Sequence, residues 1–261
     1  MNQFGTLLHK EWREITRNFK IIWLPIVFIL FGISEPLTNY FLPQILDSVG
    51  NLPEGAVIEM PTPPAEQVLV AIMGQYQFIG MLVLVLAFMG AIAGERSNGN
   101  ATLLYVRPLS YPAYYWSKWL MASVVALISL WTGLLAGYYY TSILFWTVDF
   151  VDFLQFAMTY SVWILLVVSI TLTASAIMPN SGLAAALSFA VIFLVQIVDG
   201  LIGMYWTVSP VKIPAYAAEW LTGTPNLSHF WWAIVLGIAI ISLLIALGIW
   251  AARRNAGNVR V

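Results

Sequence analysis

Residues 154–178 read LQFAMTYSVWILLVVSITLTASAIM, a stretch of 25 residues without a charged side chain. An α-helix rises about 1.5 Å per residue, so this stretch is long enough to cross a bilayer core about 30 Å thick. Long uncharged runs of this kind are typical of membrane proteins. The sequence therefore predicts a membrane-spanning helix here.

Five more apolar runs of similar length lie on either side of this stretch. Together they predict six spans, at residues 21–40, 76–94, 119–145, 154–178, 183–206 and 230–252. The whole chain is 61% hydrophobic and 9% charged, whereas soluble chains carry about 25% charged residues. These values exclude a water-soluble enzyme and a nucleic-acid binder. They predict an all-α, polytopic membrane protein that forms a single transmembrane domain over residues 1–261.

The positive charges predict the orientation of the chain in the membrane. Ten of the eleven Lys and Arg residues fall on one side of the predicted spans, and only Lys212 falls on the other. The ten are Lys10, Arg13, Arg17, Lys20, Arg96, Arg107, Lys118, Arg253, Arg254 and Arg260. Cytoplasmic loops carry an excess of Lys and Arg. We therefore expect both termini in the cytoplasm, as an even number of spans also allows.

Several kinds of chemistry are unexpected in this chain. It has no cysteine, which excludes disulfides, thiolate metal sites and thiol catalysis, and its two histidines make a histidine-ligated metal centre improbable. The phosphate-binding pattern Gly-x-x-x-x-Gly-Lys-Ser/Thr does not occur. We expect no catalytic residue, cofactor or metal ion in this chain, and no ATP binding of the phosphate-loop kind.

The residues before the first span have the pattern of an amphipathic helix, at 3–19. Their apolar members recur at helical spacing and are Phe4, Leu7, Leu8, Trp12, Ile15 and Phe19. The cations Lys10, Arg13 and Arg17 occupy the remaining faces. This pattern predicts a helix lying in the cytoplasmic interface. It serves either as a surface anchor or as a docking surface for a cytoplasmic partner.

Residues 95–118 form the longest cytoplasmic connection. A short helix is expected at 99–106, because Pro108 disfavours helix at the residue before it. A second helix is expected to begin at Tyr111 and to lead into the third span. On these residues alone, an ordinary solvated loop with positively charged anchors explains the segment equally well.

Two motifs resemble those of permeases of the ABC-2 transporter family. The opening LLHKEWREITRN, residues 7–18, is similar to that family's Lys-Glu and downstream Arg signature. Residues 95–118 are similar to its Glu-x-x-x-Gly-Thr, Pro-x-Ser-Arg and terminal Lys pattern. The chain departs from the pattern at Asn100, where the family usually has Thr, and at Tyr111, where it usually has Arg.

The resemblance implies a permease subunit in a bacterial plasma membrane, forming half of a substrate pathway with a second permease chain, identical or different. Export is the direction usual in the family. A separate ATPase subunit would carry ATP and Mg²⁺ and would couple through Glu95, Arg96, Gly99, Arg107, Pro108, Ser110 and Lys118. The N-terminal helix would dock beside it through Lys10, Glu11, Arg13 and Arg17.

The two longest outer connections are predicted at 42–75 and 207–229. The first is rich in proline and carries four acids and no cation. The second is broken by prolines, and in the family this connection forms short re-entrant helices. Charged side chains within spans are energetically costly, so those that occur are candidates for a functional role. We therefore assign Glu35 and Asp199 to a tentative substrate path, together with Tyr138, although an outer aromatic belt also explains the tyrosine.

Three other classes of function remain open. A membrane-embedded enzyme would need titratable groups gathered at one depth, and the spans offer only two acids, Glu35 and Asp199, with no histidine and no cation. An ion-coupled secondary transporter usually shows inverted repeats, and no convincing internal repeat occurs. A non-transporting sensor or assembly subunit would share the same fold.

Overall fold

The computed structural model describes residues 3–49, 62–98 and 110–256. These residues form helices joined by short connections, and none of them forms a strand. Six helical segments among them are long and apolar enough to cross a membrane. They are Lys20–Gln44, Ala65–Ser97, Tyr111–Leu144, Phe150–Ile177, Ser181–Ile202 and Leu227–Asn255. The predicted all-α fold with six spans is confirmed.

The helices follow one another in a simple order. The first two are α1 (Gln3–Arg17) and α2 (Lys20–Val49). The second span combines α3 (Ala65–Gln75), the π-helix η1 (Tyr76–Gly80), α4 (Met81–Phe88) and α5 (Ala93–Ser97). The remaining elements are α7 (Tyr111–Leu144), α8 (Phe150–Ile177), α9 (Ser181–Ile202), the 3₁₀ helix η2 (Pro210–Lys212), α10 (Ile213–Thr222) and α11 (Leu227–Ala256).

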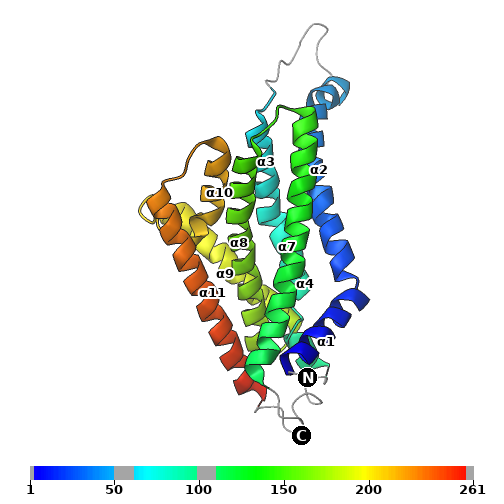
Figure 1. Cartoon of the computed structure of the whole chain (residues 1–261), viewed down its shortest axis with the longest axis vertical. Helices are drawn as coiled ribbons and strands as arrows, with labels where there is room; N and C mark the ends of the chain where they lie inside the picture. The colour runs from blue at the N-terminus through cyan, green and yellow to red at the C-terminus, as the bar shows by residue number, and fades with distance from the viewer. Residues whose placement is uncertain (1–2, 50–61, 99–109, 257–261) are drawn as a thin grey trace.

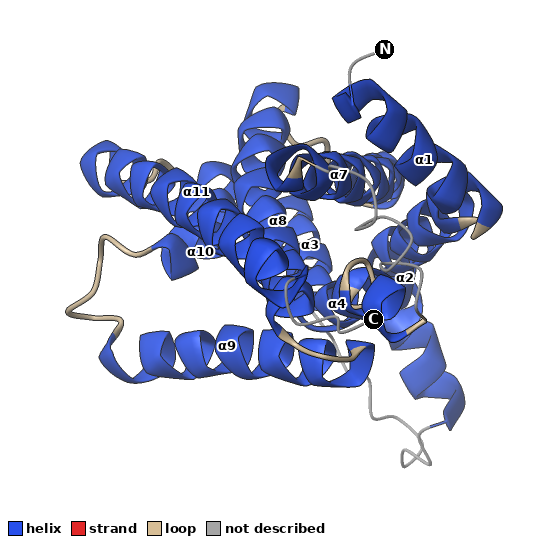
Figure 2. Cartoon of the chain, turned by 90° about the horizontal axis from the view of Figure 1, so that it is seen from below, coloured by secondary structure: helices blue, strands red, loops and turns tan. Residues whose placement is uncertain are grey.

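Helix α8 lies at the centre of the bundle. In its most apolar stretch 72% of the residues are buried, against 22% in α9, 28% in α2 and 33% in α11. It packs against α4, α7, α9, α10 and α11. Figure 2 shows α8 surrounded by other helices, with α2 and α9 at the periphery. The peripheral helices present exposed apolar side chains, as expected for surfaces that face lipid.

The beginning of the chain and the end of its last helix lie at the same end of the bundle (Figure 1). We call this the terminal end. It also holds α1, α5 and the start of α7, while η2, α10 and the connection from α7 to α8 lie toward the opposite end. The chain therefore crosses an even number of times, as the sequence predicts.

The first two spans extend further into the expected outer connection than the sequence predicts. Helix α2 continues to Val49 through Pro36 and Pro43, and the second span begins at Ala65, directly after the extended Pro64, instead of at residue 76. The expected connection 42–75 is thus helical at both ends. Helices η2 and α10 provide the short helices expected within 207–229, and α10 packs against α8 and α3.

Helices α2 and α7 cross at glycines. A Cβ atom on Gly133 would lie 2.7 Å from the Phe28 carbonyl oxygen, and a Cβ on Gly32 would collide with the Gly133 carbonyl oxygen. On Gly137 it would lie 3.1 Å from the Gly32 carbonyl oxygen. The backbones approach so closely because these residues lack side chains. Gly133 and Gly137 therefore serve the packing of these helices.

Candidate functional site

A buried group of charged side chains joins three helices at the terminal end. Lys118 of α7 lies at its centre with only 2% of its surface exposed. Its Nζ is 2.9 Å from Glu11 Oε1 of α1 and 2.9 Å from Glu95 Oε1 of α5. Both glutamates are themselves buried. We call Glu11, Glu95 and Lys118 the charge cluster.

Neighbouring polar groups complete the charge cluster. The Tyr114 hydroxyl donates a hydrogen bond of 2.6 Å to Glu95 Oε2, and the Lys118 ammonium lies 5.2 Å from the centre of the Tyr114 ring. At the rim, Lys10 forms ion pairs with Glu95, Glu11 and Glu14. Buried charges are tolerated when they are paired and hydrogen-bonded. The cluster meets that condition.

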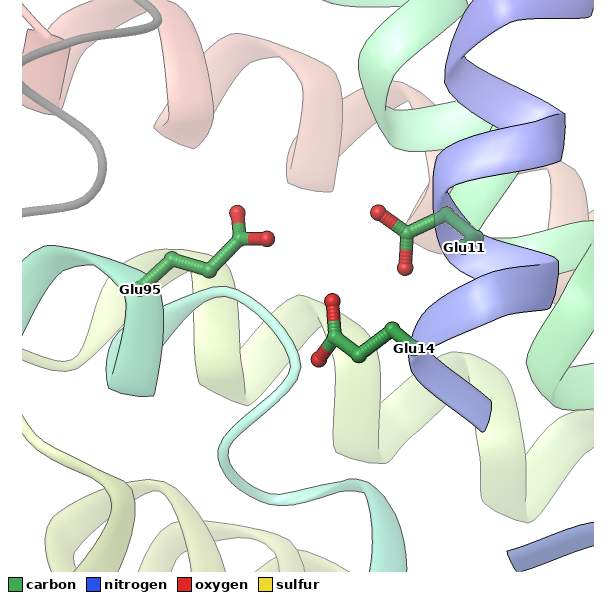
Figure 3. A group of neighbouring side chains, drawn as sticks. All are labelled: Glu11, Glu14 and Glu95. Atoms are coloured by element: carbon green, nitrogen blue, oxygen red, sulfur yellow. The ribbon is translucent and has the colours of Figure 1, made fainter. Parts of the chain in front are cut away.

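Figure 3 shows Glu11, Glu14 and Glu95 pointing toward a common space, two from α1 and one from α5. Their nearest carboxylate oxygens lie within 4.8 Å of one another, a spacing that a metal ion could bridge. The ammonium groups of Lys10 and Lys118 already lie among these oxygens and supply the positive charge. The arrangement is therefore an ion-pair network between helices, and it does not require a metal.

The sequence of α1 explains how Glu11 reaches the interior. Leu7, Glu11 and Ile15 recur every four residues and are the buried residues of this helix. Trp12 lies on another face and is 44% exposed, as is expected for a ring that contacts lipid headgroups. Helix α1 therefore packs through a narrow stripe that contains one charged residue. The chain then turns at Phe19, whose φ of 54° is unusual for an aromatic residue.

A second polar contact ties α5 to the end of α8. The Arg96 guanidinium donates to the carbonyl oxygens of Ser175, Ala176 and Met178, with 3.1 Å to Ala176. These carbonyls lack partners within the helix because it ends there. Asn255 of α11 also donates to the Ala176 carbonyl oxygen, at 2.8 Å. Arg96 therefore holds α5 against the end of the central helix α8.

The chain is similar to known membrane proteins along nearly its whole length. A family model described as "ABC-2 family transporter protein" matches residues 6–251. The chain belongs to the ABC-2 transporter family. A relative from Bacillus subtilis (strain 168), named "Uncharacterized transmembrane protein YxlG", is 34% identical over 258 residues, which cover 97% of this chain and 98% of the relative.

In this ABC-2 family protein, the predicted coupling residues that the structure describes do not form a solvated loop. Glu95 and Lys118 are buried, and Arg96 faces the end of α8. Ser110 is exposed directly before α7, which begins at Tyr111 as predicted. The predicted helix at 99–106 and the residues Gly99, Arg107 and Pro108 lie outside the described residues.

The predicted docking residues of α1 divide into two groups. Glu11 is buried in the charge cluster, and Lys10 lies at the rim of it. Arg13 and Arg17 are exposed. Both line a groove of about 720 Å³ at the terminal end. Its full lining is Thr6, His9, Lys10, Arg13, Glu14, Arg17 and Asn18.

The three residues of the tentative substrate path lie on different helices, and each has a partner of its own. Glu35 of α2 accepts a hydrogen bond from Asn39. The Tyr138 hydroxyl of α7 donates to the Val148 carbonyl oxygen at 3.0 Å. Asp199 of α9 pairs with Lys212, with 3.2 Å between Oδ2 and Nζ. The structure does not bring the three together in one site.

Sequence reasoning missed two contributors to the site, Tyr114 and Asn255. Tyr114 lies one helical turn before Lys118, so its spacing was a usable signal once α7 was expected to begin at Tyr111. Asn255 lies beyond the last predicted span and has no distinctive local pattern. Its role depends on the position of the α8 end, which only the fold determines.

Proposed function

We propose that this chain is the permease subunit of an ATP-driven exporter in a bacterial plasma membrane. It forms half of a substrate pathway with a second permease chain, and a separate ATPase subunit that binds ATP and Mg²⁺ docks at its terminal end. Membership of the ABC-2 family supports the proposal. The described cations also support a cytoplasmic terminal end, because Lys212 is the one among them that lies toward the opposite end.

The observation that carries the proposal is the charge cluster. An ATPase that moves α1 can affect the membrane domain only through contacts that transmit the movement. Lys118 provides such contacts, because it holds Glu11 of α1 and Glu95 of α5 at 2.9 Å each. Helix α7 then continues for 34 residues, from the terminal end to the opposite end of the bundle. A displacement of α1 or α5 would therefore pull on a helix that crosses the whole membrane.

The docking surface of this proposal is the exposed groove on α1. Arg13 and Arg17 project from it, whereas the buried stripe of Leu7, Glu11 and Ile15 faces the bundle. A groove with an excess of positive charge is complementary to an acidic surface, which would steer association and orient the partner. We expect the ATPase subunit to present carboxylates to this groove.

Charge reversal tests the docking surface. The double variant Arg13→Glu with Arg17→Glu should weaken the association with the ATPase subunit at least tenfold, because like charges across an interface cost several kcal/mol. The matched control is Arg253→Glu with Arg254→Glu, which reverses two exposed charges of α11 at the same end. Co-purification of the ATPase subunit, measured for both variants at equal expression, shows whether the partner docks on α1. Equal loss in both would contradict docking on α1.

A further inference from the structure

A cavity of about 890 Å³ opens at the end of the bundle opposite the termini. It lies between the last turns of α2, the residues before α3 and the end of α7. Its lining includes Asn39, Tyr40, Thr62, Pro64, Phe145 and Trp146. Binding sites for small molecules commonly have volumes of about 300–1,000 Å³ and apolar walls with a few polar groups. This cavity has both properties.

Aromatic rings form much of the wall. The rings of Tyr40 and Phe145 lie edge to face, with their centres 6.4 Å apart. Tyr40 is 45% exposed and Trp146 is 86% exposed, so much of their surface lies open in the part of the chain that the structure describes. Aromatic faces attract cations electrostatically, and clusters of such rings bind quaternary ammonium groups. The walls therefore favour an organic cation over an anion of the same shape.

The polar residues at the cavity also favour a cation over an anion. The Asn39 amide nitrogen donates to both the backbone carbonyl oxygen and the carboxylate of Glu35, at 2.9 Å and 3.3 Å. Because this amide nitrogen is occupied, the group that Asn39 has left to offer a ligand is its carbonyl oxygen, which accepts. Glu35 places a negative charge one helical turn deeper.

We propose that this cavity is a binding site for an organic cation with an apolar body. The aromatic rings of Tyr40, Phe145 and Trp146 surround the cationic group, and Glu35 supplies the attracting charge through Asn39. This binding site is separate from the proposed coupling to an ATPase, because its ligand binds to this chain alone. It can therefore be tested on the purified chain without any ATPase subunit, and its failure would leave the coupling proposal intact.

Two ions of equal shape and opposite charge provide the test. Radiolabelled tetraphenylphosphonium and tetraphenylborate are dialysed to equilibrium against the purified full chain in a neutral maltoside detergent, and binding to empty micelles is subtracted. The cation should bind saturably with one ion per chain, and the borate at least tenfold more weakly. Equal binding of both ions would show mere partitioning into apolar surface and would overturn the proposal.

Single substitutions test whether the cation binds in this cavity. Trp146→Ala removes an exposed ring at little risk to folding, and Glu35→Gln removes the charge while keeping the shape. Each should weaken tetraphenylphosphonium binding about tenfold, in line with the loss of one strong cation contact. Trp250→Ala is the matched control, because it removes an exposed ring at the terminal end. Binding by Trp146→Ala that equals binding by Trp250→Ala would also overturn the proposal.

Discussion

Lys118 and Glu95 lie 23 positions apart in the chain, yet Lys118 Nζ and Glu95 Oε1 are 2.9 Å apart in the interior of the bundle. The same ammonium group is also 2.9 Å from Glu11 Oε1, 107 positions away. One buried cation thus holds α1, α5 and the start of α7 together. The terminal end of this membrane protein is therefore built as one connected unit.

Removing that cation should destabilise the protein strongly. Lys118→Met leaves two buried carboxylates without their main counter-charge, and breaking a buried ion pair in this way costs about 3–5 kcal/mol. The free energy of unfolding in detergent, measured by chemical denaturation, checks this value. Lys10→Met is the matched control, because Lys10 is half-exposed and its ion pairs should contribute about 1 kcal/mol or less. Equal effects of the two substitutions would contradict a structural role for the charge cluster.

The crossing of α2 and α7 should not tolerate a methyl group. Gly133→Ala places a Cβ against the Phe28 backbone, at 2.7 Å from its carbonyl oxygen, and overpacking of this kind costs about 1–3 kcal/mol. Gly200→Ala in α9 is the control, because no atom lies within 4 Å of its Cβ position. Thermal unfolding should separate the two, with the control unchanged or slightly stabilised because Ala favours helix. A Gly133→Ala protein as stable as the control would refute the close approach.

Accessibility to a reagent should show which side the terminal end faces. The chain has no cysteine, so single cysteines can be introduced freely. Asn98→Cys marks the terminal end and Thr147→Cys marks the opposite end, and both positions are exposed. A membrane-impermeant maleimide added to intact cells should label only the cysteine at 147, with labelling at 98 after permeabilisation. Labelling at 98 in intact cells would reverse the proposed orientation.

The sequence predicted the spans well because burial in lipid is a local requirement. A charged side chain at a helix centre costs about 2.5–3.5 kcal/mol on the insertion scale, so uncharged runs mark the spans directly. The ends were predicted less accurately. The second span was predicted to start at 76, although the helix begins at Ala65 and carries Glu66 in its first turn. Polar residues are allowed in the first turn of a helix that emerges from the membrane core.

The charge cluster was not predicted, because its partners meet only after folding. Glu11 did carry a signal, since it lies on the same helix face as Leu7 and Ile15, and a charged residue in an apolar stripe requires a partner. No local pattern identifies that partner as Lys118, which the sequence placed at the end of the connection 95–118. The apolar residues of α1 likewise gave no indication that Leu7 would be buried and Trp12 exposed.

In the proposed function, this chain transmits the free energy of ATP hydrolysis from a separate ATPase subunit to its own membrane helices. The most direct measurement is the ATP turnover of the complex isolated through a tag on this chain. We expect turnover that disappears when the phosphate-loop lysine of the co-purified ATPase subunit is substituted, and no turnover by this chain alone, because its sequence contains no phosphate loop. Turnover by this chain free of any partner, or turnover by the complex that survives the lysine substitution, would contradict the proposed function.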